Sequence, residues 1–189
     1  MQIILSSDDY ADDNPFPEME IGELIERYPM FCITLLAITL KTSKFIDNPC
    51  IKYGFHGLNH EGLECSEWTK DDTEQFIDIA KTMSSSYNVK FCKVFKAPRW
   101  KISQEAFDTL TQDGWIVYLH PNDDKTGNNV YRSHINPKQI RTDTKGIQKV
   151  TTHVADVCGN GIRESMGYLM NLPETTKFHF IDSYMREEK

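Results

Sequence analysis

Two histidines four residues apart, His56 and His60, are the residues whose types and spacing most directly suggest chemistry. In an extended chain this spacing spans roughly 13 Å, too far for two imidazoles to share one ion. On a helical turn both imidazoles would lie on one face, and Gly57 between them lets the chain turn. The pair could then bind a metal ion through nitrogen bonds of about 2.0–2.1 Å. Two surface histidines beside a turn are the alternative interpretation.

Two adjacent carboxylates, Asp8 and Asp9, follow a short apolar run at residues 3–5. Carboxylates beside a buried strand are costly unless they bind or titrate something, although a solvated acidic loop is equally compatible with the pattern. Two imidazoles and one carboxylate form a three-ligand site with an open position, suited to a divalent transition metal and above all to zinc. The second carboxylate could then act as general base toward a water activated by the metal.

Composition narrows the class of protein. With 189 residues one domain is expected, and 21 basic against 28 acidic residues give a net charge of −7, which argues against a nucleic-acid partner. The five cysteines show no Cys-x-x-Cys spacing, which favours reduced thiols. The sequence shows no charged leader and no apolar run of about 20 residues, so we expect a cytoplasmic protein without a membrane partner. The oligomeric state stays open.

The elements that must position these residues are predicted from apolar periodicity. Strands are predicted at residues 3–5, 31–40, 90–95, 115–119, 149–155 and 177–181, and in the run from residue 51 to the histidine pair. Helices are predicted over 18–28, after Thr69, after Ser103 and after Gly161, and no regular element is predicted in 122–148. This alternation predicts an α/β fold with a parallel sheet. The distinctive residues all follow strands, and in a β/α barrel the carboxyl ends of the strands form the active-site face.

The pattern resembles the polysaccharide deacetylases of carbohydrate esterase family 4. The resemblance is carried by Asp8-Asp9, by His56-x-x-x-His60 and by the segment 95–100, Phe-Lys-Ala-Pro-Arg-Trp, and it extends from residue 3 to about residue 168. It implies a distorted (β/α)7 barrel that forms one catalytic domain over residues 1–189. It also implies metal-dependent removal of N- or O-acetyl groups from a carbohydrate substrate.

The resemblance also implies roles for single residues. Asp8 would be the catalytic base, and Asp9, His56 and His60 would be the metal ligands. Where the family's first motif commonly ends in glycine, this chain has Tyr10.

In the third motif, Lys96 stands where the family has an arginine that holds the base. Lysine keeps the charge but lacks the planar guanidinium group, which can form two hydrogen bonds to one carboxylate. Arg99 could partly take over the role of the family's arginine. Trp100, Tyr10 and His120 are expected to contact the sugar.

The catalytic acid has two candidates. His153 matches the family by order along the chain and His120 by local pattern, and we favour His153 because it lies on the later strand. Asp156 or Asp113 could orient it. Two other functions stay open, namely a non-catalytic carbohydrate- or metal-binding relative and another metal-dependent amidohydrolase.

Overall fold

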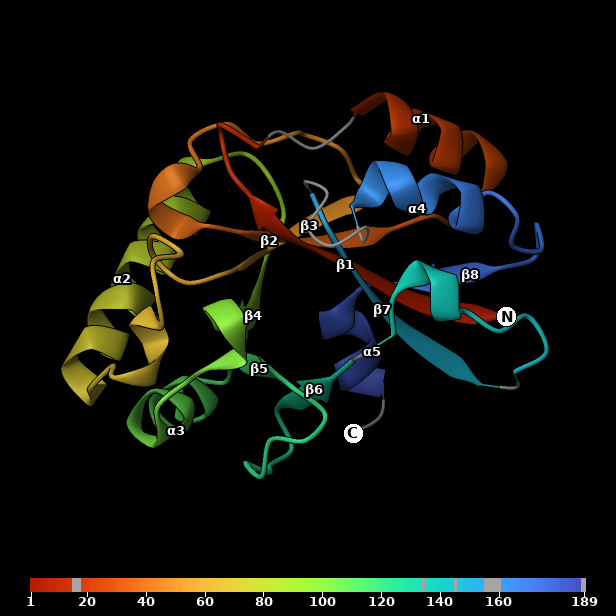
Figure 1. Ribbon diagram of the computed structural model, residues 1–189. Coiled ribbons are helices and arrows are strands. Elements are labelled where there is room, and N and C mark those ends of the chain that lie inside the picture. Colours follow the sequence, from red (N-terminus) through yellow and green to blue (C-terminus); the bar gives the residue numbers. More distant parts are fainter. Residues whose placement is uncertain (15–17, 134, 145, 155–160, 188–189) are drawn as a thin grey trace.

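The centre of the molecule is a sheet of parallel strands that curves into a nearly closed barrel (Figure 1). The computed structural model describes residues 1–14, 18–133, 135–144, 146–154 and 161–187. The strand order is β6-β5-β4-β3-β2-β1-β7, and an isolated parallel bridge between Ile135 and Val150 links the two ends. The strands are β1 (Gln2–Tyr10), β2 (Ile33–Ala37), β3 (Ile51–Phe55), β4 (Phe91–Lys96), β5 (Ile116–Leu119), β6 (Val130–Arg132), β7 (Ile147–His153) and β8 (Lys177–His179). The predicted distorted (β/α)7 barrel is confirmed.

The helices of the described residues form two pairs outside the barrel and one helix at its end. They are α1 (Glu18–Arg27), α2 (Lys70–Ser86), α3 (Gln104–Gln112), α4 (Ile162–Leu169) and α5 (Ile181–Glu187). Helix α1 packs beside α4 and α2 beside α3 (Figure 1). Short 3₁₀ turns are η1 (Thr39–Lys41), η2 (Glu64–Ser66), η3 (Pro98–Trp100) and η4 (Pro137–Gln139). Within the described ranges, the helices are all too short or too polar to cross a membrane.

Alternation along the strands decides which side chains enter the barrel. Ile3 and Leu5 of β1 pack outward in the core cluster that includes α1 and α4, whereas Ile4 points inward. Ile4 shares its cluster with residues of α5, which closes the barrel at the amino-terminal ends of the strands. The same alternation places Ser6 and then Asp8 inside, both almost fully buried. The interior is thus apolar at one end and polar at the other.

Strand β1 is longer than predicted. The sequence predicts a strand at residues 3–5 followed by a loop, but β1 continues to Tyr10. Its partners explain the difference, since β7 pairs with it as far as Asp8 opposite His153, and β2 pairs with it at Tyr10. Asp8 and Asp9 therefore belong to the strand rather than to a solvated loop.

The segment 122–148 was predicted to lack regular structure, and this expectation is wrong. It contains η4 and the three-residue strand β6, whose central Tyr131 is fully buried. Conversely, β8 at 177–179 pairs with β1 outside the ring order, and helix α5 was not predicted. Three residues are too few to show a period of two, so only the neighbouring strand β5 identifies β6.

Candidate metal centre and active site

Three potential metal ligands meet at the carboxyl ends of β1 and β3. Asp9 Oδ1 lies 3.3 Å from His56 Nε2 and 3.1 Å from His60 Nε2. One donor atom from each residue lies within 4.8 Å of the others. Asp9 Oδ1 is buried and accepts no hydrogen bond from the described part of the chain. A buried carboxylate oxygen without a partner, facing two imidazole nitrogens, fits a divalent transition metal.

The protonation of His56 supports the same interpretation. Its Nδ1 lies 2.8 Å from the carbonyl oxygen of Lys96, at the end of β4. A carbonyl can only accept, so Nδ1 carries a proton, and in the neutral tautomer Nε2 would present a lone pair to Asp9. Two acceptors then face each other, an arrangement that a cation or a proton between them would stabilise.

Asp9 reaches the histidines through an irregularity in β1. The pairing of β1 with β2 shifts by one residue between Ser7 and Tyr10, which is a β-bulge. Asp9 has a φ of 64°, in the left-handed region, and Asn14 Nδ2 donates a 2.8 Å hydrogen bond to its carbonyl. The bulge frees Asp9 from strict alternation, so two adjacent carboxylates can serve one site.

Burial and charge oppose each other at Asp9. Burial raises the pKa of its carboxyl group, but the neighbouring imidazoles of His56, His60 and His153, when protonated, outweigh burial and lower the pKa to about 2. Burial and the neighbouring His56 lower the pKa of His60. Near neutral pH this favours a carboxylate and a neutral imidazole, the forms that bind metals.

His60 is positioned by a tight loop rather than by the predicted helical turn. Gly57 and His60 both have positive φ, 71° and 57°. The Glu64 carboxylate accepts hydrogen bonds from the N–H groups of Leu58, Asn59 and His60 at 3.0–3.1 Å. A Cβ at Gly57 would lie 2.0 Å from Glu64 Oε1. Glu64 thus shapes the loop, and sequence reasoning missed it because the nearby Glu61 and Glu67 offer the same side chain.

Asp8 precedes the candidate metal ligand Asp9 in the chain and is almost fully buried. Its Oδ2 forms an ion pair with Lys96 Nζ and lies 3.8 Å from His153 Nε2. Its Oδ1 has no hydrogen-bond partner among the described residues. A carboxylate held by a lysine therefore lies close to an imidazole, one residue before the candidate ligand Asp9.

Arg99, Trp100 and His120 contribute to the wall of a hollow of about 750 Å³, which contains none of the candidate metal ligands. Arg99 is exposed and forms no ion pair within the described ranges, so it does not replace Lys96 at Asp8. The centroids of the His120 and Trp100 rings lie 5.7 Å apart, and His120 Nδ1 accepts a hydrogen bond from the backbone N–H of Asn122. Of the two candidate acids, His153 rather than His120 lies at Asp8.

Tyr10 lies in the core instead of at this opening. It is 4% exposed, its hydroxyl donates to the carbonyl of Lys44 at 2.7 Å, and its ring packs on Phe45 and Tyr53. The expectation that Tyr10 contacts a sugar does not agree with this burial.

The residues proposed to orient His153 are not at the site. Asp113 caps the end of α3, before β5, and accepts hydrogen bonds from Lys93 Nζ and Trp115 Nε1, each at 3.0 Å. The amino-terminal end of β5 is opposite to the end that carries the site, so the Asp113 assignment is wrong. Asp156 lies outside the described residues.

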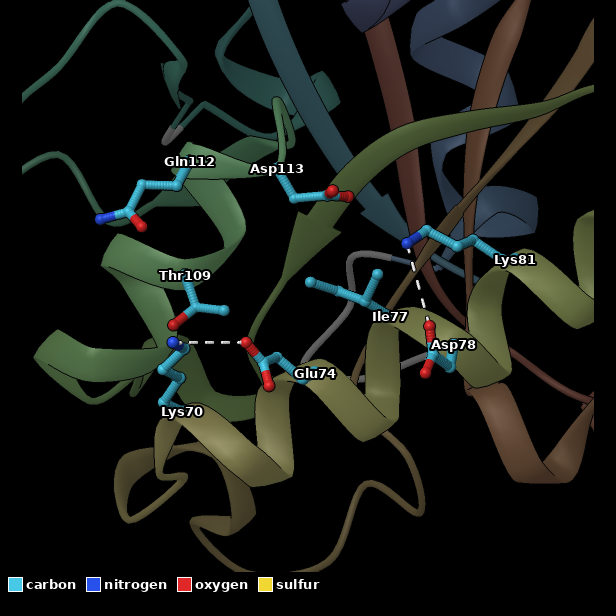
Figure 2. A pocket seen from close by; sticks show the side chains of 8 residues that line it. All are labelled: Lys70, Glu74, Ile77, Asp78, Lys81, Thr109, Gln112 and Asp113. Carbon is cyan, nitrogen blue, oxygen red and sulfur yellow. Dashed lines mark ion pairs between the residues drawn. The ribbon is translucent and has the colours of Figure 1, made fainter.

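A second hollow of about 460 Å³ lies between α2 and α3 (Figure 2). Its charged side chains pair along α2, with Lys70 3.6 Å from Glu74 and Lys81 3.8 Å from Asp78. It contains none of the residues of the metal centre. We interpret it as a solvated surface between two helices.

Comparison with known proteins connects this geometry to a fold family. No family model and no curated protein matches the sequence. A family 4 acetyl xylan esterase from Clostridium thermocellum, solved with a cobalt ion, is 12% identical, with a TM-score of 0.61 over 100% of this chain and 92% of that chain. The peptidoglycan N-acetylglucosamine deacetylase Bc1960 is 15% identical, with a TM-score of 0.63 over 96% and 86%. A mutant of BA3943, a CE4 family pseudoenzyme, is 12% identical, with a TM-score of 0.61 over 97% and 67%. The chain therefore has the fold of the polysaccharide deacetylases of carbohydrate esterase family 4.

Proposed function

We propose that residues 1–189 form a metal-dependent deacetylase, which removes acetyl groups from an N-acetylated sugar or polysaccharide by hydrolysing the amide bond. One observation carries the proposal. Asp8 lies next to the ligand Asp9 in the chain, and His153 Nε2 lies 3.8 Å from Asp8 Oδ2 across the pair β1–β7. A ligand set, a carboxylate base and an imidazole acid are the groups that metal-assisted acyl hydrolysis requires.

Each residue has a distinct task in this reaction. A divalent ion held by Asp9, His56 and His60, with zinc as our first choice, would lower the pKa of a bound water and polarise the acetyl oxygen. Asp8 accepts a proton from the attacking water, while Lys96 holds its carboxylate in place. His153 then donates a proton to the leaving amine.

We assign the sugar to the hollow beside Trp100 and His120, which is connected to the site through Trp100, whose ring centroid lies 3.8 Å from Lys96 Nζ. Its volume of about 750 Å³ lies within the usual range for small-molecule sites. An acetyl group alone is small, so most of the binding surface would contact the sugar. Two aromatic side chains in the wall offer apolar surface to a sugar ring.

A non-catalytic relative is the second candidate, and Lys96 is the observation that favours it. Lysine binds a carboxylate as a point charge, without the bidentate geometry of arginine. The fold is also shared with a CE4 family pseudoenzyme, so the fold does not guarantee turnover.

Metal content and acetate release together test the proposal. We expect near-stoichiometric transition metal in the purified protein by elemental analysis, lost in His56→Ala. Acetate release from N-acetylated oligosaccharides should fall in Asp8→Asn, which should keep its metal.

Replacing a general acid typically costs about 10²–10⁴-fold in rate, and we expect that loss for His153→Ala but not for His120→Ala. Metal without acetate release would favour the non-catalytic relative, and unchanged metal in His56→Ala would refute the site.

A further inference from the structure

The ammonium group of Lys96 lies in an unusual environment. Lys96 is 2% exposed and has three N–H donors, but Asp8 Oδ2 is its one hydrogen-bond acceptor among the described residues. Its remaining surroundings are aromatic. Nζ lies 3.8 Å from the centroid of the Trp100 ring and 5.0 Å from that of Tyr118. Both distances are within the range in which a ring face attracts a cation.

The two rings are held in place by separate parts of the fold. Tyr118 is the register partner of Lys96 on β5, and its buried hydroxyl hydrogen-bonds to Thr151 on β7. Trp100 lies in η3, where it and Arg99 have φ values of 63° and 52°. Two consecutive side-chain-bearing residues in the left-handed region are strained, and such strain persists only where the surroundings enforce it. Trp100 also packs edge-on against Tyr118 at 5.2 Å.

We infer that Trp100 is a positioning residue: its ring face, together with that of Tyr118, fixes the Lys96 ammonium against Asp8. A lysine has a flexible stem and no planar fork, so the ion pair alone leaves its head free to rotate and shift. The two ring faces restrict it from the sides where no acceptor is present. Trp100 thereby acts on the base through Lys96, in addition to any contact with a sugar. The catalytic part of this inference rests on the proposed deacetylase function.

Kinetics can separate positioning from sugar binding. We expect Trp100→Leu to lower kcat by about ten-fold or more, whatever rise in KM the lost sugar contact causes, because the interaction with Lys96 serves the base and not the ground-state complex. Trp100→Phe keeps a ring face and should retain most of the activity. In a Lys96→Arg background, where a planar fork can grip Asp8 by itself, Trp100→Leu should cost markedly less. A rise in KM at constant kcat, or an equal loss of kcat in both backgrounds, would overturn the inference.

A second measurement needs neither metal nor turnover. In the metal-free protein, the Tm shifts of Lys96→Met and Trp100→Leu should be non-additive in a double-mutant cycle, because both changes remove the same interaction. Trp100→Phe with Lys96→Met serves as the milder pair if Trp100→Leu folds poorly. Phe45→Leu, in an aromatic cluster with Tyr10 and Tyr53, is the control and should be additive with Lys96→Met. Additive shifts for both Trp100 pairs would refute the aromatic support of Lys96. The cycle remains decisive if no acetate is released, so failure of the proposed function is distinguishable from failure of this inference.

Discussion

At the scale of single residues, the site depends on two adjacent carboxylates with different environments. Asp8 keeps the inward direction set by the pleat of β1 and is held by Lys96. Asp9 departs from the pleat through a positive φ and meets two histidines instead. Two neighbours in sequence can thus serve as base and as ligand because one residue at a bulge changes direction.

The depressed pKa of Asp9 has a consequence for stability. A carboxyl group whose pKa falls from 3.8 to about 2 on folding stabilises the protein above pH 4, and this stabilisation is lost as the pH falls from about 4 to 2. The shift corresponds to about 2 kcal/mol. Chemical unfolding of the metal-free protein should therefore show an advantage of wild type over Asp9→Asn that shrinks across this window. A difference independent of pH would contradict the assigned environment.

At the scale of elements, the loop from β3 to η2 determines where His60 points. Glu64 satisfies three backbone N–H groups of this loop, and the absence of a Cβ at Gly57 leaves room for its carboxylate. The loop is therefore built around a side chain that does not itself belong to the ligand set.

Glu64→Gln should weaken metal binding without removing a ligand. An amide presents one acceptor oxygen and no charge, so the loop loses charge-assisted hydrogen bonds and His60 loses its fixed orientation. Loss of residues that orient ligands typically costs about 10–100-fold in metal affinity, and we expect an increase in Kd of that order by chelator competition. Exposed Glu67→Gln is the matched control. Equal affinities of the two variants would show that the loop holds His60 without Glu64.

At the scale of the whole molecule, the barrel brings distant segments together at one end. Asp9 comes from β1 and both histidines follow β3, with β2 between these strands in the sheet. A bound ion would therefore tie two strands that do not pair with each other. The opposite end is closed by the apolar cluster under α5.

Metal should consequently stabilise the entire fold. An ion that binds only the native state contributes about 2.7 kcal/mol at a free concentration of 100 Kd. Thermal unfolding with zinc should therefore occur at higher temperature than after chelation, and His60→Ala should abolish most of the difference. An unchanged Tm in wild type would argue against a native-state metal site, whereas an equal increase in His60→Ala would place the ion elsewhere.

Much of the fold and of the ligand set was predictable from local pattern. The β-branched and aromatic runs at β2 to β5 are mostly buried, so their positions follow from composition, and the Thr69 cap marks the start of α2. The strand β6 was not predictable, because three residues carry no period and only pairing with β5 defines them.

The sequence by itself determined the α/β class with a parallel sheet and the residue types available for chemistry, because burial periodicity and ligand chemistry are local properties. The barrel was implied by the family resemblance. Only the tertiary structure decided which of them meet. It placed His153 rather than His120 beside Asp8, paired Lys96 rather than Arg99 with the Asp8 carboxylate, and buried Tyr10 in the core. These outcomes depend on strand register and on left-handed turns, which are set by partners far away in the chain.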